Sequence, residues 1–188
     1  MDLWVVLLVL AGVAGLMVLL YNRLVALRQS RSNAFSDIDV QLKQRYDLIP
    51  QLVETVKGYA GHEKQIFERV TEARAKVGQA GGGAGETRMK AEGLLGGAMM
   101  GLFAVAENYP SLKADQNFQR LMAELSDIEN KIAAARRFFN NATSEYNTAV
   151  QQFPANLIAG PMGFKTEAFF ELSAAETEAL NKAPEVKF

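Results

Sequence analysis

The sequence predicts an all-α protein in which an N-terminal transmembrane helix continues into an antiparallel helical bundle with long, coiled-coil-like helices. The prediction rests on three observations. A long uncharged apolar segment opens the chain, and two later segments place apolar residues at alternating steps of three and four, the spacing of one helix face. No segment has the alternation that is typical of a strand.

The opening segment, residues 3–21 (LWVVLLVLAGVAGLMVLLY), carries no charge. As a helix it extends roughly 28 Å, close to the hydrocarbon thickness of a bilayer. Trp4 and Tyr21 lie at its ends, where aromatic side chains prefer the headgroup region. Because the run is long, lacks a preceding Lys or Arg and is followed by no small-residue cleavage site, we expect residues 1–22 to form an anchor and not a cleaved signal peptide.

The charges beside this segment predict its orientation. Arg23, Arg28 and Arg31 follow it, whereas no Lys or Arg precedes it. The positive-inside rule therefore predicts that the C-terminal domain lies in the cytoplasm and the N-terminus outside.

Residues 23–153 form the predicted bundle, in which two long helices dominate. The first continues from the anchor, and its seam, apolar except for one arginine, is Leu24, Leu27, Arg31, Phe35, Ile38, Leu42, Tyr46, Ile49, Leu52, Val56 and Tyr59. Pro50 lies within it and predicts a kink or a restart, since proline lacks the N–H that the helix needs.

The last long helix has the more regular seam, which is Phe118, Leu121, Leu125, Ile128, Ile132, Ala135, Phe139, Ala142, Tyr146, Ala149 and Phe153. This pattern predicts a long amphipathic helix that packs along a partner. The first long helix is the simplest partner, and we expect the two to run antiparallel.

A shorter helix is expected over Gly61–Val77, and the residues expected on its apolar face are Ile66, Val70, Ala73 and Val77. The glycine-rich residues 78–85 then form a flexible linker. A third helix is expected over Glu86–Asn108, where each glycine costs up to about 1 kcal/mol relative to alanine. Tight packing must offset that cost, and the glycines proposed as contacts with other copies or the membrane are Gly93, Gly97 and Gly101.

Residues 154–188 are predicted to form an apolar loop and a short helix that starts at Ser173, with Glu176 completing its capping box. The large apolar side chains of this region are Leu157, Ile158, Met162, Phe164, Phe169 and Phe170. One interpretation is that this segment folds back across the bundle. The other is that it forms an exposed patch for self-association or membrane contact.

Charged residues near the two seams predict an ionic network between the long helices, and the residues assigned to it are Arg45, Asp47, Glu129 and Arg136. Arg31 of the first long helix and Arg137 of the last are further candidates for pairing between the two helices. A salt-bridge network that sets the register of the helices is the favoured interpretation, and a ligand site is the lesser one.

No motif for catalysis, cofactor binding or metal binding is recognisable. The chain has no cysteine and one histidine, His62, which excludes most metal sites of cysteine and histidine. The glycines of residues 81–85 lack the Lys and Ser or Thr of a phosphate loop, and Ile66 stands where a zinc-binding helix would have its second histidine. The net charge of −1 gives no attraction to nucleic acid.

Several blocks of sequence resemble the LemA family. They are residues 21–25 (YNRLV), 33–50 (NAFSDIDVQLKQRYDLIP), 56–60 (VKGYA) with His62 and Glu63, 102–114 (LFAVAENYPSLKA), Ala135, Arg136, Asn140, Tyr146, Asn147, Phe153, Pro154 and 163–171 (GFKTEAFFE). The resemblance covers nearly the whole chain. The sequence departs from it at the glycine-rich residues 81–85 and 93–101, where the family is usually more polar.

The resemblance implies a bacterial inner-membrane protein with one N-terminal anchor, an antiparallel helical bundle and no established enzymatic activity; some relatives are associated with magnetosome membranes. We therefore expect a non-enzymatic, self-assembling scaffold or membrane-organising protein, with the lipid bilayer and further copies of itself as partners. The alternative is an adaptor that presents its bundle to another envelope protein, such as a membrane protease or sensor. A bundle on the periplasmic side is the alternative location.

Overall fold

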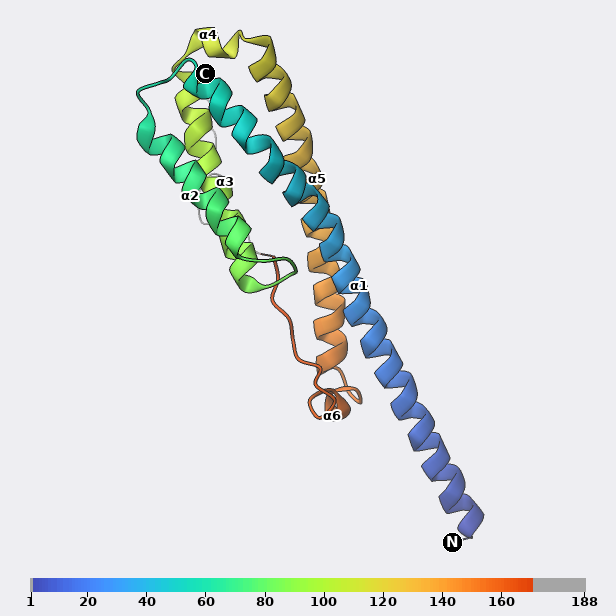
Figure 1. The fold of residues 1–188 in the computed structure, drawn as a ribbon. Helices are drawn as coiled ribbons and strands as arrows, with labels where there is room; N and C mark the ends of the chain where they lie inside the picture. Colours follow the sequence, from blue (N-terminus) through green and yellow to red (C-terminus); the bar gives the residue numbers. More distant parts are fainter. Residues whose placement is uncertain (1, 171–188) are drawn as a thin grey trace, which may run out of the picture. The chain divides into compact units, whose positions relative to one another are not determined.

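The structure is a computed structural model that describes residues 2–170 of the chain. The described part is all-helical and contains no strand, which confirms the predicted fold class. Its helices are α1 (Leu3–Lys57), α2 (Lys64–Gln79), α3 (Glu86–Glu107), α4 (Pro110–Lys113), α5 (Gln116–Gln151) and α6 (Asn156–Ala159) (Figure 1). The helix predicted from Ser173 lies outside the described residues.

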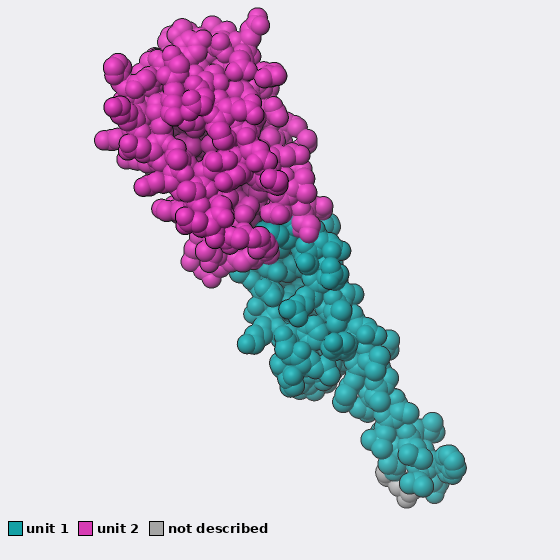
Figure 2. Space-filling model, viewed as in Figure 1, with its two compact units in different colours: residues 1–35, 137–169 teal, residues 36–136, 170–188 magenta. Residues whose placement is uncertain are grey.

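The described chain divides into two compact units (Figure 2). Unit 1 contains residues 2–35 and 137–169, and unit 2 contains residues 36–136 and Phe170. Both α1 and α5 therefore contribute one part to each unit. The boundaries expected at residues 22 and 153 were drawn where the composition of the sequence changes. The two compact units instead follow which residues contact one another, so their boundaries fall at other positions.

The first part of α1 is the apolar segment that opens the sequence. Its most apolar window of 18 residues has a mean hydropathy of 2.9, and none of that window is buried inside the structure. A weaker window in α3 has a mean hydropathy of 1.2, and 44% of it is buried. Both helices are long and apolar enough to cross a membrane, but only in α1 does the apolar window lie outside the protein core.

In unit 1, α1 and α5 pack in antiparallel orientation (Figure 1). The rings of Phe35 and Phe139 meet edge to face, with their centroids 5.6 Å apart. Nearer the start of α1, Leu24 joins a buried cluster whose other members are Tyr146, Ala149, Val150, Ala159 and Phe164. The last two members come from α6 and the turn after it, so the segment that follows α5 completes the core of unit 1.

Unit 2 contains the rest of α1 and the beginning of α5, together with α2, α3 and α4. The seam positions of α1 that are buried here are Ile38, Leu42, Ile49, Leu52 and Val56. Tyr59 is an exception, because α1 ends at Lys57 and 41% of the Tyr59 surface is exposed. The buried seam positions of α5 are Phe118, Leu121, Leu125, Ile128 and Ile132.

Within unit 2, α2 packs beside α3 (Figure 1). α2 begins at Lys64, three residues later than expected, and it buries Phe67 in place of the predicted Ile66. Ile66 is half-buried and faces α3, because a Cβ added at Gly101 would lie 3.7 Å from Ile66 Cδ1. Neighbouring residues of a helix lie about 100° apart, so both side chains border the same face.

Pro50 lies inside α1, and the helix continues through it without restarting. The predicted restart is therefore wrong. Pro50 has no N–H to donate to the carbonyl of Tyr46 four residues earlier. Arg74 of α2 supplies a donor instead, since its Nε lies 3.1 Å from the Tyr46 carbonyl oxygen. The Arg74 guanidinium also stacks on the Tyr46 ring at 3.9 Å, so backbone and ring both hold α2 against α1.

Replacing Arg74 with methionine should lower the free energy of unfolding by about 1–3 kcal/mol, because the Tyr46 carbonyl loses its donor. In a Pro50→Ala background the same replacement should cost less, since the new residue donates its own N–H to that carbonyl. A double-mutant cycle from denaturant unfolding in mild detergent measures the difference. Equal costs in both backgrounds would show that Arg74 acts by stacking alone.

α5 begins with a side-chain cap that the periodicity did not indicate. The Phe118 N–H donates to Asp115 Oδ1 at 2.8 Å, which satisfies one free amide of the first turn. The Tyr59 hydroxyl donates to Oδ2 of the same carboxylate at 3.0 Å. These bonds hold the pKa of the Asp115 carboxyl below its ordinary value and define where α5 starts.

Candidate functional site

The most buried charges of unit 2 form one ionic network. Arg45 of α1 is 3% exposed, and Glu92 of α3 is 2% exposed. Arg45 Nη2 donates to Glu92 Oε2 at 2.6 Å, and Arg45 Nη1 donates to Glu129 Oε1 of α5 at 3.0 Å. One arginine therefore connects three helices of the bundle.

Arg88 of α3 extends this network. Its Nε lies 2.8 Å from Glu92 Oε1, and its Nη2 lies 3.6 Å from Asp39 Oδ1 of α1. Burial lowers the pKa of the Arg45 guanidinium, but the carboxylates of Glu129 and Glu92 outweigh this effect and raise that pKa overall. Arg45 thus has two carboxylate partners, and the geometry favours a structural ion pair over a site for an anionic ligand.

The structure brings together two of the four residues that the sequence assigned to an inter-helix network, Arg45 and Glu129. Asp47 lies elsewhere, since it pairs with Lys43 at 3.3 Å on the exposed surface of α1. The guanidinium of Arg136 lies over the ring of Phe170, 4.9 Å from its centroid.

Arg88 and Glu92 are members of the network that the sequence did not indicate. Their spacing of four residues on one helix was the available signal, because side chains at that spacing lie on the same face. The glycines around them had favoured the interpretation of this helix as a contact surface for other molecules. In the structure, Glu92 is 2% exposed and points into unit 2.

In unit 1, Arg31 of α1 holds the segment that follows α6. Its Nε donates to Thr143 Oγ1 of α5 at 3.1 Å, and its Nη2 donates to the Ala168 carbonyl at 3.1 Å. The guanidinium also lies over the Phe139 ring, 4.7 Å from the centroid, and 3.6 Å from a carboxylate oxygen of Glu167. Burial lowers the pKa of Arg31, and the Glu167 carboxylate opposes that shift.

Asn147 of α5 holds the same segment. Its Nδ2 donates to the Glu167 carbonyl at 2.9 Å, and its Oδ1 accepts the Glu167 N–H at 2.8 Å. The side-chain amide thus pairs with both backbone groups of one residue, as a neighbouring strand would. Arg31 and Asn147 together tie residues 167–168 to the helical pair of unit 1.

Replacing Asn147 with alanine should loosen the attachment of Glu167 to α5. Two backbone hydrogen bonds are lost, each worth about 0.5–1.5 kcal/mol, so the Glu167 amide should exchange its hydrogen about tenfold faster or more. Hydrogen–deuterium exchange of peptides that cover this segment measures the effect. Asn141→Ala, at an exposed position of the same helix, is the matched control and should change nothing. An unchanged exchange rate in the Asn147 variant would contradict the assignment.

The apolar residues predicted to act together after position 154 divide into two sets. Phe164 and Phe170 are each 4% exposed, and the ring of Phe164 meets Tyr21 edge to face at 5.6 Å. The exposed residues are Leu157, Met162 and Phe169, with Ile158 half-buried. The expected loop is also interrupted, because residues 156–159 form α6.

The glycines of α3 proposed as outside contacts, Gly93, Gly97 and Gly101, are half-buried in unit 2. A Cβ added at Gly101 would make ordinary van der Waals contact with Ile66 Cδ1 at 3.7 Å, so Gly101 borders α2 and an alanine would fit there.

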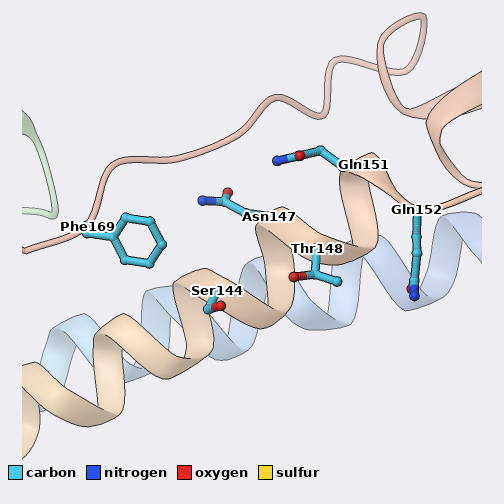
Figure 3. A pocket seen from close by; sticks show the side chains of 6 residues that line it. All are labelled: Ser144, Asn147, Thr148, Gln151, Gln152 and Phe169. Atoms are coloured by element: carbon cyan, nitrogen blue, oxygen red, sulfur yellow. The ribbon is translucent and has the colours of Figure 1, made fainter.

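A polar groove runs along α5 in unit 1, lined by Ser144, Asn147, Thr148, Gln151, Gln152 and Phe169 (Figure 3). None of these side chains is charged, and Asn147 is already bonded to the backbone of Glu167. The groove therefore lacks the acid, base or activated nucleophile that catalysis needs. Within residues 2–170, no group of three or more histidine, aspartate or glutamate side chains is placed to hold a metal ion.

These features define a helical-bundle protein with an apolar N-terminal helix. The sequence profile of the LemA family matches residues 34–188. The chain belongs to the LemA family, as its sequence blocks indicated. The family and the apolar helix together indicate a membrane-associated helical protein.

Named relatives support this assignment. The chain is 28% identical over 182 residues to the magnetosome protein MamQ of Magnetospirillum gryphiswaldense. The aligned region covers 84% of this chain and 67% of the relative. Magnetosome protein MamQ 2 of Paramagnetospirillum magneticum is 28% identical over 189 residues, with 87% and 70% covered. Protein LemA of Metamycoplasma hominis is 25% identical over 157 residues, with 82% and 70% covered.

Proposed function

We propose that the protein is held in a membrane by a single span, residues 3–21 of α1. The observation that carries this proposal is the 18-residue window of mean hydropathy 2.9, none of which is buried in the structure. Burying apolar surface is worth about 25 cal/mol per Å², so an uncovered helix of this composition is stable only when another apolar medium surrounds it. A bilayer supplies that medium at the length of this segment.

The bundle lies on the cytoplasmic side of a bacterial inner membrane in this proposal. Arg23 and Arg28 support this side, since both are exposed just after the apolar segment. Because the chain has no cysteine, a cysteine placed at exposed Glu124 reports the side through a maleimide that cannot cross membranes. Labelling in spheroplasts without lysis would favour the periplasmic alternative instead.

The anchored bundle acts as a self-assembling scaffold that organises the membrane, with no enzymatic step. Relatives named magnetosome proteins support this direction, and so does the use of the most buried charges for packing. Exposed apolar side chains on α3, such as Leu94 at 58% and Met100 at 41%, are candidate contacts between copies.

The mass and shape of the full-length protein in mild detergent test the scaffold role, by light scattering and then electron microscopy. A large, closed and uniform assembly is the expected result. Monodisperse monomers across a range of concentrations would defeat it. Co-purification of one foreign protein at fixed stoichiometry would favour an adaptor that presents the bundle to another envelope protein.

A further inference from the structure

The chain between the end of α5 and the tied segment of unit 1 is free of charge over a long distance. No Asp, Glu, Lys or Arg occurs between Glu145 and Lys165. Within this stretch, the side chains of Phe153, Leu157 and Met162 are 78%, 66% and 45% exposed. Together these three residues are called the α6 patch. Large exposed apolar side chains in an uncharged stretch of chain are typical of a contact with another molecule or a membrane.

Helical geometry turns part of the α6 patch away from the core. The Ala159 N–H bonds to the Ala155 carbonyl at 2.9 Å, which is a helical step of four residues. Ala155 and Ala159 are buried, one turn apart. Leu157 precedes Ala159 by two residues, a rotation of about 200°, and so lies on the opposite side of α6. The two alanines therefore face the core, and Leu157 faces outward.

Contacts in the core of unit 1 place α6 and the turn after it beside Tyr21 and Leu24 of α1. The Phe164 ring meets the Tyr21 ring at 5.6 Å, and Leu24 and Ala159 belong to the same buried cluster. Tyr21 is the last residue of the apolar run, and aromatic side chains of this kind mark the membrane interface. The fold of unit 1 therefore holds the α6 turn beside the point where the proposed span leaves the bilayer.

The charges near this level suit an anionic surface. Arg23 and Arg28 of α1 and Lys165 after the turn are exposed. Glu167 is the acidic residue nearest to Lys165 in the sequence, and its carboxylate lies 3.6 Å from the Arg31 guanidinium. A segment that combines exposed apolar side chains with neighbouring cations binds the headgroup region of anionic bilayers.

We propose that the α6 patch inserts into the headgroup region of the same bilayer that holds α1. The inference rests on the proposed anchor and extends it, because unit 1 then contacts the membrane at two places. Two contacts fix the orientation of unit 1 on the membrane, which a single helix leaves free to rotate and tilt. The competing hypothesis is that a second copy of the chain covers the α6 patch, and the test below distinguishes the two.

Site-directed nitroxide labels test this proposal in the full-length protein. Because the chain has no cysteine, single variants take one label each: Leu157→Cys and Met162→Cys in the patch, with two controls. Val9→Cys reports the anchor, and Asn141→Cys reports an exposed position of α5, about 15 Å along the helix from Gln151. The labelled proteins are placed in vesicles of phosphatidylcholine and phosphatidylglycerol. Collision rates with oxygen and with a neutral nickel chelate give the depth of each label.

Both patch labels should collide with nickel several-fold less often than the Asn141 label, and more often than the Val9 label. Patch labels that match Asn141, with Val9 deep in the bilayer, would overturn the inference and leave the anchor intact. A Val9 label fully open to nickel would overturn both. Patch labels shielded from nickel and oxygen alike, with dipolar broadening between copies, would overturn the inference in favour of self-association.

Discussion

Replacing Arg45 with methionine should lower the free energy of unfolding by about 3–5 kcal/mol, the cost of leaving a buried charge without its partner. Glu92 is 2% exposed and loses its 2.6 Å bond to Arg45 in this variant. Arg88 still faces Glu92, but it is also shared with Asp39. Denaturant unfolding of the full-length chain in mild detergent measures the loss.

Two further variants make this result specific to the buried network. Lys43→Met breaks the Lys43–Asp47 pair on the surface of the same helix, where the side chains are 74% and 57% exposed, and it should cost less than about 1 kcal/mol. Arg45→Met combined with Glu92→Leu removes both buried charges and should recover much of the loss, since apolar replacements of buried pairs are well tolerated. A loss below about 1 kcal/mol for Arg45→Met alone would contradict the role of Arg45 as the partner that stabilises the buried Glu92.

Replacing Phe139 with alanine should destabilise unit 1 by about 3–5 kcal/mol, through lost apolar burial and the cavity that remains. Phe139 is 0% exposed, its ring meets Phe35 at 5.6 Å, and the Arg31 guanidinium lies on it at 4.7 Å. The variant therefore removes a core side chain and the apolar support of the arginine that holds residues 167–168. We expect faster hydrogen exchange in that segment together with the global loss.

The neighbouring residue supplies a matched control. Phe138 is 57% exposed, so Phe138→Ala removes the same atoms from the surface and should change stability by about 0.5 kcal/mol or less. Thermal unfolding in detergent compares the two variants directly. Equal shifts would contradict the orientation of α5, because they would require both phenylalanines to share one environment.

The helix faces of the two long helices followed from the sequence. Leu24, Ile38, Leu42, Ile49 and Leu52 of α1 are each 1% exposed or less, at the positions that the spacing of three and four selects. This spacing is a property of one helix, so it identifies a buried face without knowledge of the partner. The restart predicted at Pro50 was wrong, because α1 continues through the proline and Arg74 supplies the donor that the Tyr46 carbonyl would otherwise lack.

The all-α class, the apolar N-terminal helix, the buried faces of the two long helices and the family could be predicted from the order of the residues alone. The contacts between distant groups could be read only from the folded chain: Arg74 with the Tyr46 carbonyl, Arg45 with Glu92, and Arg31 with the backbone of Ala168. Periodicity describes one helix at a time, whereas a buried polar group needs a partner that another element supplies. The apolar residues after position 154 also differ in burial, which their sequence does not indicate: Phe164 is 4% exposed and Leu157 is 66% exposed.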